Sequence, residues 1–162
     1  MIKSIHIQNI QSHEDSYLDF SSGVNIIIGS SDSGKTAIIR ALRKLVWNKP
    51  SGSAIQSSWG GSSIIRLETE DGSVVWSKDK TDTYILQLTG KKDLVFKAFG
   101  TSVPEEINSV LNFNEINLQN QLDTPFLLSE TPGAVATHFN KIARLDKIDI
   151  GLQINLFFRT FY

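Results

Sequence analysis

Hydrophobic and polar residues alternate near the start of the chain, a pattern that predicts two half-buried β-strands. Apolar residues take every second position from Ile5 to Gln8, and the alternation returns over residues 17–20 after a polar stretch. Beyond Gly23, residues 24–28 form an almost continuous apolar run, which is typical of a strand covered on both faces. The pattern therefore predicts two strands of a half-buried sheet followed by a central parallel strand.

The hydrophobic period changes to that of a helix after Gly34. Apolar residues recur at three- and four-residue intervals, and basic residues occupy the opposite side. The pattern predicts an amphipathic helix from Lys35 to Trp47 or Asn48. A loop rich in serine and glycine is expected over residues 50–63.

The middle of the chain has the pattern of an antiparallel sheet. Asp71 and Gly72 separate two strand-like runs at residues 64–68 and 73–77, and such a pair tolerates the positive φ angles of a tight turn. Two further short runs on either side of Gly90 predict another strand pairing.

Two helices are predicted in the last third of the chain. Ser102 and Glu105 have the spacing of a capping box, which predicts a short helix after them. Thr131 and Pro132 have the pattern of a second helix start, and the apolar spacing extends this helix to about Ile150.

Composition excludes several classes of protein. The chain has 162 residues, 40% hydrophobic and 20% charged, as in an ordinary globular domain. Its net charge of -1 gives no global sign of nucleic-acid binding, and the lack of cysteine excludes disulfides, thiolate catalysis and Cys-ligated zinc. The N-terminus is too polar for a signal peptide or a membrane span, so we expect a cytoplasmic protein with no membrane partner.

One motif carries recognisable chemistry. The pattern G-x-x-x-x-G-K-[S/T] lies between the apolar run and the amphipathic helix, and its residues are Gly29, Ser30, Ser31, Asp32, Ser33, Gly34, Lys35 and Thr36. The two glycines let backbone N–H groups curl toward a phosphate, and Lys35 adds a positive charge for the β- and γ-phosphates. Thr36 offers a hydroxyl oxygen to Mg²⁺. The motif predicts binding of ATP and Mg²⁺; an ordinary Gly- and Ser-rich turn before a helix is the alternative.

The residues around this loop resemble a known family. Residues 5–13, 18–20 and 23–29, together with the loop, are similar to the N-terminal head segment of SbcC-like DNA-repair ATPases of the SMC superfamily. The resemblance implies an α/β fold: the N-terminal lobe of an ABC-type P-loop ATPase, with a central mixed sheet, antiparallel β-hairpins and a C-terminal helix. It also implies a lobe over residues 1–150 and a tail over 151–162, where relatives begin a coiled coil.

A second match lies near residue 119. The run Leu118-Gln119-Asn120-Gln121-Leu122-Asp123 resembles the family's Q-loop. The resemblance makes Gln119 the candidate that reaches Mg²⁺ and the attacking water, with Gln121 as a competitor; a solvated loop amide is the alternative. The family's signature motif, its Asp-Glu strand and its switch histidine do not follow, and neither His6 nor His138 replaces them. Hydrolysis is therefore expected to need a C-terminal lobe.

Two departures from the family pattern affect the nucleotide site. Ser31-Asp32 stands where relatives have Asn-Gly, which puts a carboxylate beside the phosphate loop. Gln11 stands where many relatives carry Arg or Lys, and we keep it as a candidate nucleotide neighbour.

The resemblance also implies partners. In relatives two heads sandwich ATP, so we expect a second ATPase head, an SbcD-like nuclease and DNA. The lysines that could contact DNA are Lys78, Lys80, Lys91, Lys92 and Lys97. A small P-loop kinase and a non-catalytic anion-binding domain are the alternative functions; a kinase needs an arginine-bearing lid, and neither Arg66 nor Arg144 lies in such a context.

Overall fold

Six antiparallel strands form one sheet in the part of the chain that the computed structural model describes, residues 1–97, 102–119, 122–125 and 127–143. The strands are β1 (Ile2–Ile10), β2 (His13–Asp19), β3 (Ser63–Thr69), β4 (Gly72–Lys78), β5 (Asp82–Leu88) and β6 (Leu94–Lys97). Their order is β2-β1-β3-β4-β5-β6, and each neighbouring pair is antiparallel. The predicted strand pairs are confirmed, as is the α/β class.

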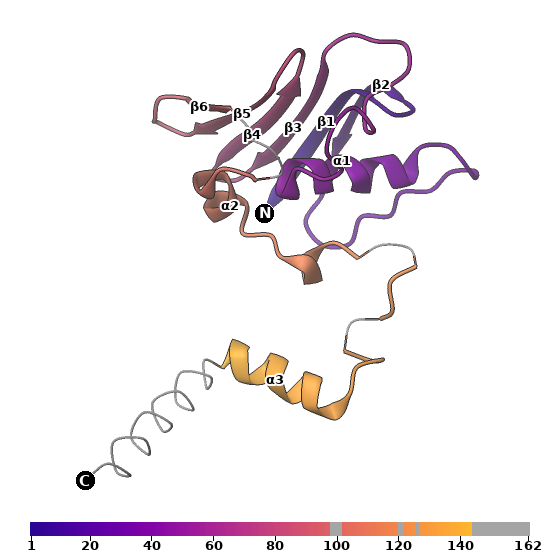
Figure 1. Ribbon diagram of the computed structural model, residues 1–162, viewed down its shortest axis with the longest axis vertical. Helices are drawn as coiled ribbons and strands as arrows, with labels where there is room; N and C mark the ends of the chain where they lie inside the picture. Colours follow the sequence, from indigo (N-terminus) through magenta and orange to yellow (C-terminus); the bar gives the residue numbers. More distant parts are fainter. Residues whose placement is uncertain (98–101, 120–121, 126, 144–162) are drawn as a thin grey trace. The chain divides into compact units, whose positions relative to one another are not determined.

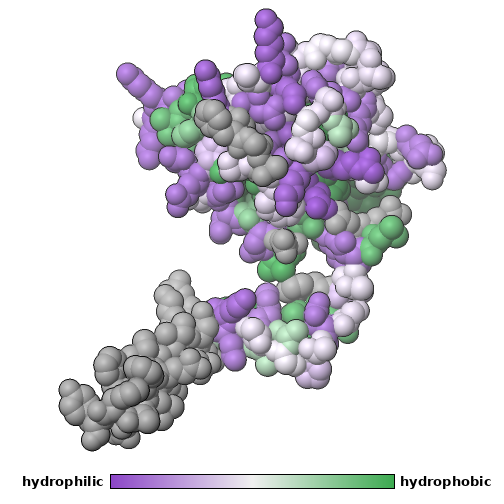
Figure 2. Space-filling model, viewed as in Figure 1, coloured by the Kyte–Doolittle hydropathy of each residue, from purple (hydrophilic) through white to green (hydrophobic). Residues whose placement is uncertain are grey.

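Helix α1 (Lys35–Trp47) packs on one face of this sheet, against β1, β3 and β4 (Figure 1). Its buried side includes Ile38, Leu42 and Leu45, which recur at the predicted spacing and meet the inward side chains of the strands. Figure 2 shows the same side of this unit as mainly hydrophilic, since the apolar face of α1 is turned inward. The predicted helix is confirmed.

The apolar run at residues 24–28 differs from the prediction. It has no regular secondary structure and pairs with no strand in the described part of the chain, and Val24, Ile26 and Ile28 are 87%, 79% and 87% exposed. The preceding turn is closed by Asn25, whose side-chain oxygen accepts from the Ser21 N–H at 3.0 Å. The predicted central parallel strand is therefore not formed within the described residues, because a strand buried on both faces needs neighbouring strands and none of the described strands pairs with residues 24–28.

The β3–β4 hairpin turns one residue earlier than predicted. Glu70 and Asp71 form the turn, and Gly72 already belongs to β4. A Cβ atom on Gly72 would lie 2.1 Å from the Gln87 carbonyl oxygen of β5. The glycine is thus required by the close approach of a third strand.

Short helices follow the sheet. Helix α2 (Glu105–Leu111) confirms the predicted short helix, and its N-cap residue is Pro104, where no side chain caps the helix. A 3₁₀ turn, η1 (Glu115–Asn117), follows it.

The chain divides into two compact units between Leu118 and Gln119, and α3 (Pro132–Ile142) belongs to the second unit. The Thr131 hydroxyl accepts from the Ala134 N–H at 3.3 Å, which confirms the predicted helix start. The predicted helix end near Ile150 and the tail over 151–162 lie outside the described residues. No helix among the described residues is long and apolar enough to cross a membrane.

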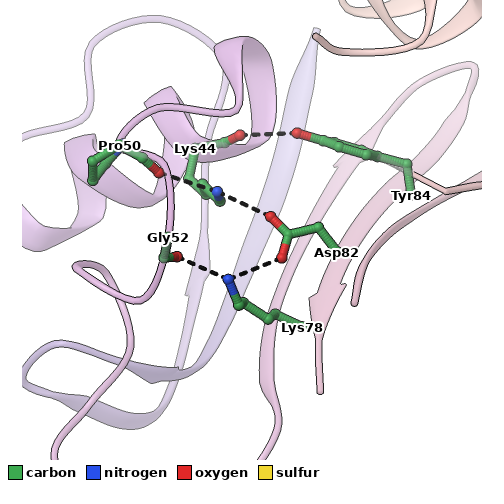
Figure 3. Close-up of polar contacts among 6 residues, drawn as sticks. All are labelled: Lys44, Pro50, Gly52, Lys78, Asp82 and Tyr84. Carbon is green, nitrogen blue, oxygen red and sulfur yellow. Dashed lines mark hydrogen bonds and ion pairs between the residues drawn. The ribbon is translucent and has the colours of Figure 1, made fainter. Parts of the chain in front are cut away.

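A buried charge ties the end of α1 to the sheet (Figure 3). The Lys44 side chain is fully buried, and its Nζ lies 3.2 Å from Asp82 Oδ2 and 3.1 Å from the Pro50 carbonyl oxygen. Asp82 also pairs with Lys78 at 3.1 Å, and the Tyr84 hydroxyl donates to the Lys44 carbonyl at 3.0 Å. Burial lowers the pKa of Lys44 although the Asp82 carboxylate opposes this, and burial raises the pKa of Tyr84.

We predict that Asp82→Ala destabilises the fold by about 3 kcal/mol, because it leaves the Lys44 ammonium buried without its carboxylate. Adding Lys44→Met should recover part of this loss, since the unpaired charge is then removed. Urea unfolding of the single and double variants measures both effects. Asp79→Ala, at an exposed aspartate nearby, is the control and should change stability by less than about 0.5 kcal/mol. A double variant less stable than Asp82→Ala would contradict this account.

Candidate functional site

The predicted phosphate loop leads from the apolar run at residues 24–28 into the start of α1. Gly34 is the N-cap residue of α1, with φ of 89°, and no side chain caps the helix there. The first turn of α1 contains no acidic residue. The first N–H groups of a helix lack intrahelical acceptors and carry partial positive charge, so this helix start is suited to an anion.

The Lys35 side chain lies over the loop. Its Nζ donates to the Gly29 carbonyl at 2.8 Å, the Ser30 carbonyl at 2.5 Å and the Ser33 hydroxyl at 3.2 Å. An ammonium group has three donors, so all three are used within the loop. A phosphate must take over at least one of them, and the longest of the three contacts, to Ser33, is the easiest to exchange.

The two motif glycines have different roles. Gly34 adopts a positive φ, as expected for a curled backbone. Gly29 does not; a Cβ there would instead lie 2.7 Å from Ser33 Oγ, so the constraint at Gly29 is space beside a side chain that can rotate. The other left-handed residue of the loop is Asp32, with φ of 59°. This explains the departure from Asn-Gly, because aspartate is among the few residues that tolerate this conformation.

The metal prediction rests on Thr36, which lies exposed in the first turn of α1. No group of three His, Cys, Asp or Glu residues gathers as a metal site in the described ranges. Mg²⁺ commonly takes one or two protein oxygens and completes its shell with water and substrate phosphates. One exposed hydroxyl beside an anion site fits that mode.

The turn between β1 and β2 lies against the loop. His13 Nε2 is 3.0 Å from the Gly34 carbonyl oxygen, and its Nδ1 is 2.8 Å from Ser16 Oγ. Gln11, the candidate nucleotide neighbour, accepts from Arg40 Nη1 of α1 at 3.1 Å. No pattern in the sequence points to His13 as a contact of the loop, because periodicity carries no signal for a residue at a strand start that meets a distant loop.

Gln119, the candidate at the second motif, belongs to the unit over residues 119–162. Its exposed amide Nε2 donates to the Thr124 carbonyl at 3.2 Å and the Asp123 carbonyl at 3.4 Å. Its role at a metal or at the attacking water stays a prediction, and Gln121 lies outside the described residues.

His6 binds Asp15 at 2.6 Å, and hydrogen bonds from His6 and Gln8 hold the Asp15 pKa below its usual value.

The lysines considered for DNA contact fall into two groups. Lys78 pairs with Asp82 and donates to the Gly52 carbonyl at 2.9 Å, so it has a structural role. The other four, Lys80, Lys91, Lys92 and Lys97, are exposed. DNA contact through these four stays a prediction.

Comparisons with known proteins agree with this picture. A family model described as an AAA domain matches residues 4–150. The DNA double-strand break repair Rad50 ATPase of Pyrococcus abyssi is 28% identical over 166 residues, which cover 91% of this chain and 18% of that protein. The corresponding ATPase of Sulfurisphaera tokodaii is 28% identical over 127 residues, which cover 71% of this chain and 14% of that protein. The chain thus spans less than a fifth of the length of these curated relatives.

A solved structure supports the fold. It comes from work on ATP-driven dimerization and DNA-stimulated activation of SMC ATPases, and it matches with a TM-score of 0.55 and 12% identity over 87% of this chain and 98% of that one. The predicted resemblance to the head segment of a DNA-repair ATPase is confirmed by the family match and the Rad50 relatives, and the solved structure supports the fold alone. They do not favour the kinase or the anion-binding alternative.

We predict that removing the Asp32 charge strengthens nucleotide binding. Asp32→Asn keeps a side chain that tolerates the left-handed backbone, whereas Asp32→Gly also relieves the strain. Both should lower the Kd for ATP by about fivefold at low salt, as expected for about 1 kcal/mol of repulsion near a phosphate. Only Asp32→Gly should also raise the unfolding free energy. Calorimetric titration and urea unfolding measure the two effects, and an unchanged Kd for Asp32→Asn would refute the charge effect.

Proposed function

Since the chain belongs to the family described as an AAA domain, matched over residues 4–150, we propose that it is the ATP-binding N-terminal part of an SMC- and Rad50-like ATPase acting in DNA repair. The observation that carries the proposal is the arrangement of the loop 29–36. It places Lys35 over the loop at an uncapped helix start, with Thr36 exposed in the next position.

The chain's own groups account for nucleotide binding. The N–H groups at the start of α1 hold the phosphates, and Lys35 exchanges its contact with the Ser33 hydroxyl for a phosphate oxygen. Thr36 would hold Mg²⁺, which supplies charge neutralisation between phosphates when it is bound. Gln119 is the proposed link from the nucleotide to the rest of the protein, because an amide both donates and accepts without carrying charge.

We propose that ATP hydrolysis requires a larger assembly than this chain alone. Residues 24–28 expose four large apolar side chains and pair with no strand in the described part of the chain, which supports a need for further strands beside them. We propose that a C-terminal lobe of the whole protein supplies these strands and that a second head closes over the nucleotide. An SbcD-like nuclease and DNA are the proposed partners of the whole protein, in the cytoplasm.

We predict that the chain binds ATP weakly and that Lys35→Ala weakens this binding at least tenfold, because the ammonium group no longer meets the phosphates. Calorimetric titration with ATP, ADP and sulfate, each with and without Mg²⁺, measures the affinities. Lys91→Ala, at an exposed lysine outside the loop, is the matched control and should bind like the wild type. Equal affinity for sulfate and ATP would instead favour a simple anion site.

We predict that the 162-residue chain alone releases little or no phosphate from ATP, because the groups that activate water are assigned to a further lobe. Phosphate release at saturating ATP is the measurement. Adding the C-terminal lobe as a separate polypeptide should raise the rate at least tenfold, and Lys35→Ala should abolish this gain. Turnover by the chain alone that disappears in Lys35→Ala would show that the further lobe is dispensable.

A further inference from the structure

His13 starts β2 and faces the last glycine of the loop. Its half-buried ring lies between the Gly34 carbonyl oxygen, 3.0 Å from Nε2, and the Ser16 hydroxyl, 2.8 Å from Nδ1. A carbonyl oxygen only accepts hydrogen bonds, so Nε2 carries the proton and donates to Gly34. In the neutral ring Nδ1 then accepts from Ser16, and the two contacts together fix the tautomer and the orientation of the ring.

The Gly34 carbonyl receives two donors. Besides His13 Nε2, the Ala37 N–H donates to it at 2.8 Å in the first turn of α1. A carbonyl oxygen has two lone pairs, so this acceptor is saturated. The direction of the carbonyl is therefore set by the helix on one side and by the β1–β2 turn on the other.

The direction of this carbonyl determines the direction of the next N–H. The peptide unit is planar and trans, so the N–H of Lys35 points opposite to the Gly34 carbonyl. The Lys35 N–H is one of the first N–H groups of α1, which have no acceptor within the helix and are suited to an anion. Holding the carbonyl toward His13 thus holds this N–H toward the anion site.

The β1–β2 turn next to His13 is itself held in place. Ile10, at the end of β1, is fully buried, and the Gln11 N–H donates to the Ile55 carbonyl at 2.9 Å. The turn also leaves no room at Gly34, where a Cβ would lie 2.6 Å from Ser12 Oγ and 2.9 Å from His13 Nε2. Glycine is therefore required at position 34 for two reasons: the backbone has a positive φ there, and the β1–β2 turn leaves no room for a Cβ atom.

We propose that His13 is a positioning residue for phosphate binding, whose Nε2–H holds the Gly34 carbonyl so that the Lys35 N–H faces the bound anion. The proposal rests on the proposed ATP-binding function for its effect on affinity. The contact to the carbonyl, in contrast, exists without nucleotide and is tested without it.

The first test uses ATP titration. His13→Ala should raise the Kd for ATP about tenfold, because the Gly34–Lys35 peptide then reorients more freely. His13→Gln places an amide donor near the position of Nε2 and should restore most of the affinity. His6→Ala is the matched control, because it removes a histidine of the same strand pair that binds Asp15 instead. Equal weakening by His13→Ala and His13→Gln, or no weakening by His13→Ala, would overturn the proposal.

The second test needs no ligand. In isotope-labelled protein without nucleotide, His13→Ala should shift the Gly34 carbonyl carbon and the Lys35 amide resonances, His13→Gln should shift them less, and His6→Ala should leave them in place. If the wild type fails to bind ATP, the proposed function is wrong. The Gly34 and Lys35 resonances then show by themselves whether His13 positions this peptide unit. Unchanged Gly34 and Lys35 resonances in His13→Ala would overturn this role.

Discussion

The packing of α1 on the antiparallel sheet is the constraint on which the candidate site depends. The helix begins with the lysine of the phosphate loop, so its position on the sheet determines where its N-terminal N–H groups lie. At its far end the buried Lys44 pairs with Asp82 and binds the Pro50 carbonyl. A helix held at its end as well as along its apolar face has little freedom to slide, and the loop at its start shares that restriction.

The loop receives its remaining restraint from the turn between β1 and β2. His13 reaches the Gly34 carbonyl, and Gln11 accepts from Arg40 one turn beyond the start of α1. These contacts come from a strand pair whose inward residues belong to the same core as α1. The phosphate loop is therefore built from a short sequence motif, but its surroundings are supplied by residues more than twenty positions earlier.

The local patterns predicted most of the fold. Helix α1, the two strands near the start of the chain and the antiparallel hairpins from β3 to β6 follow from hydrophobic period and turn residues, because each pattern reflects which side chains can be buried together. The predictions failed where the conformation of a residue depends on contacts with distant parts of the chain. Gly72 matches a turn pattern, but the Gln87 carbonyl of a third strand requires it. Residues 24–28 have the pattern of a buried strand, although the described residues provide no neighbouring strand for them.

The phosphate-loop motif and the order of elements around it could be derived from the amino-acid sequence, because a glycine-rich loop between an apolar run and an amphipathic helix needs only neighbouring residues to be recognised. The contacts of His13 with Gly34 and of Lys44 with Asp82 could not, since they join residues 21 and 38 positions apart. The left-handed backbone at Asp32 also became visible only in the folded loop. Such contacts depend on how strands and helix pack in three dimensions, and no local pattern records that packing.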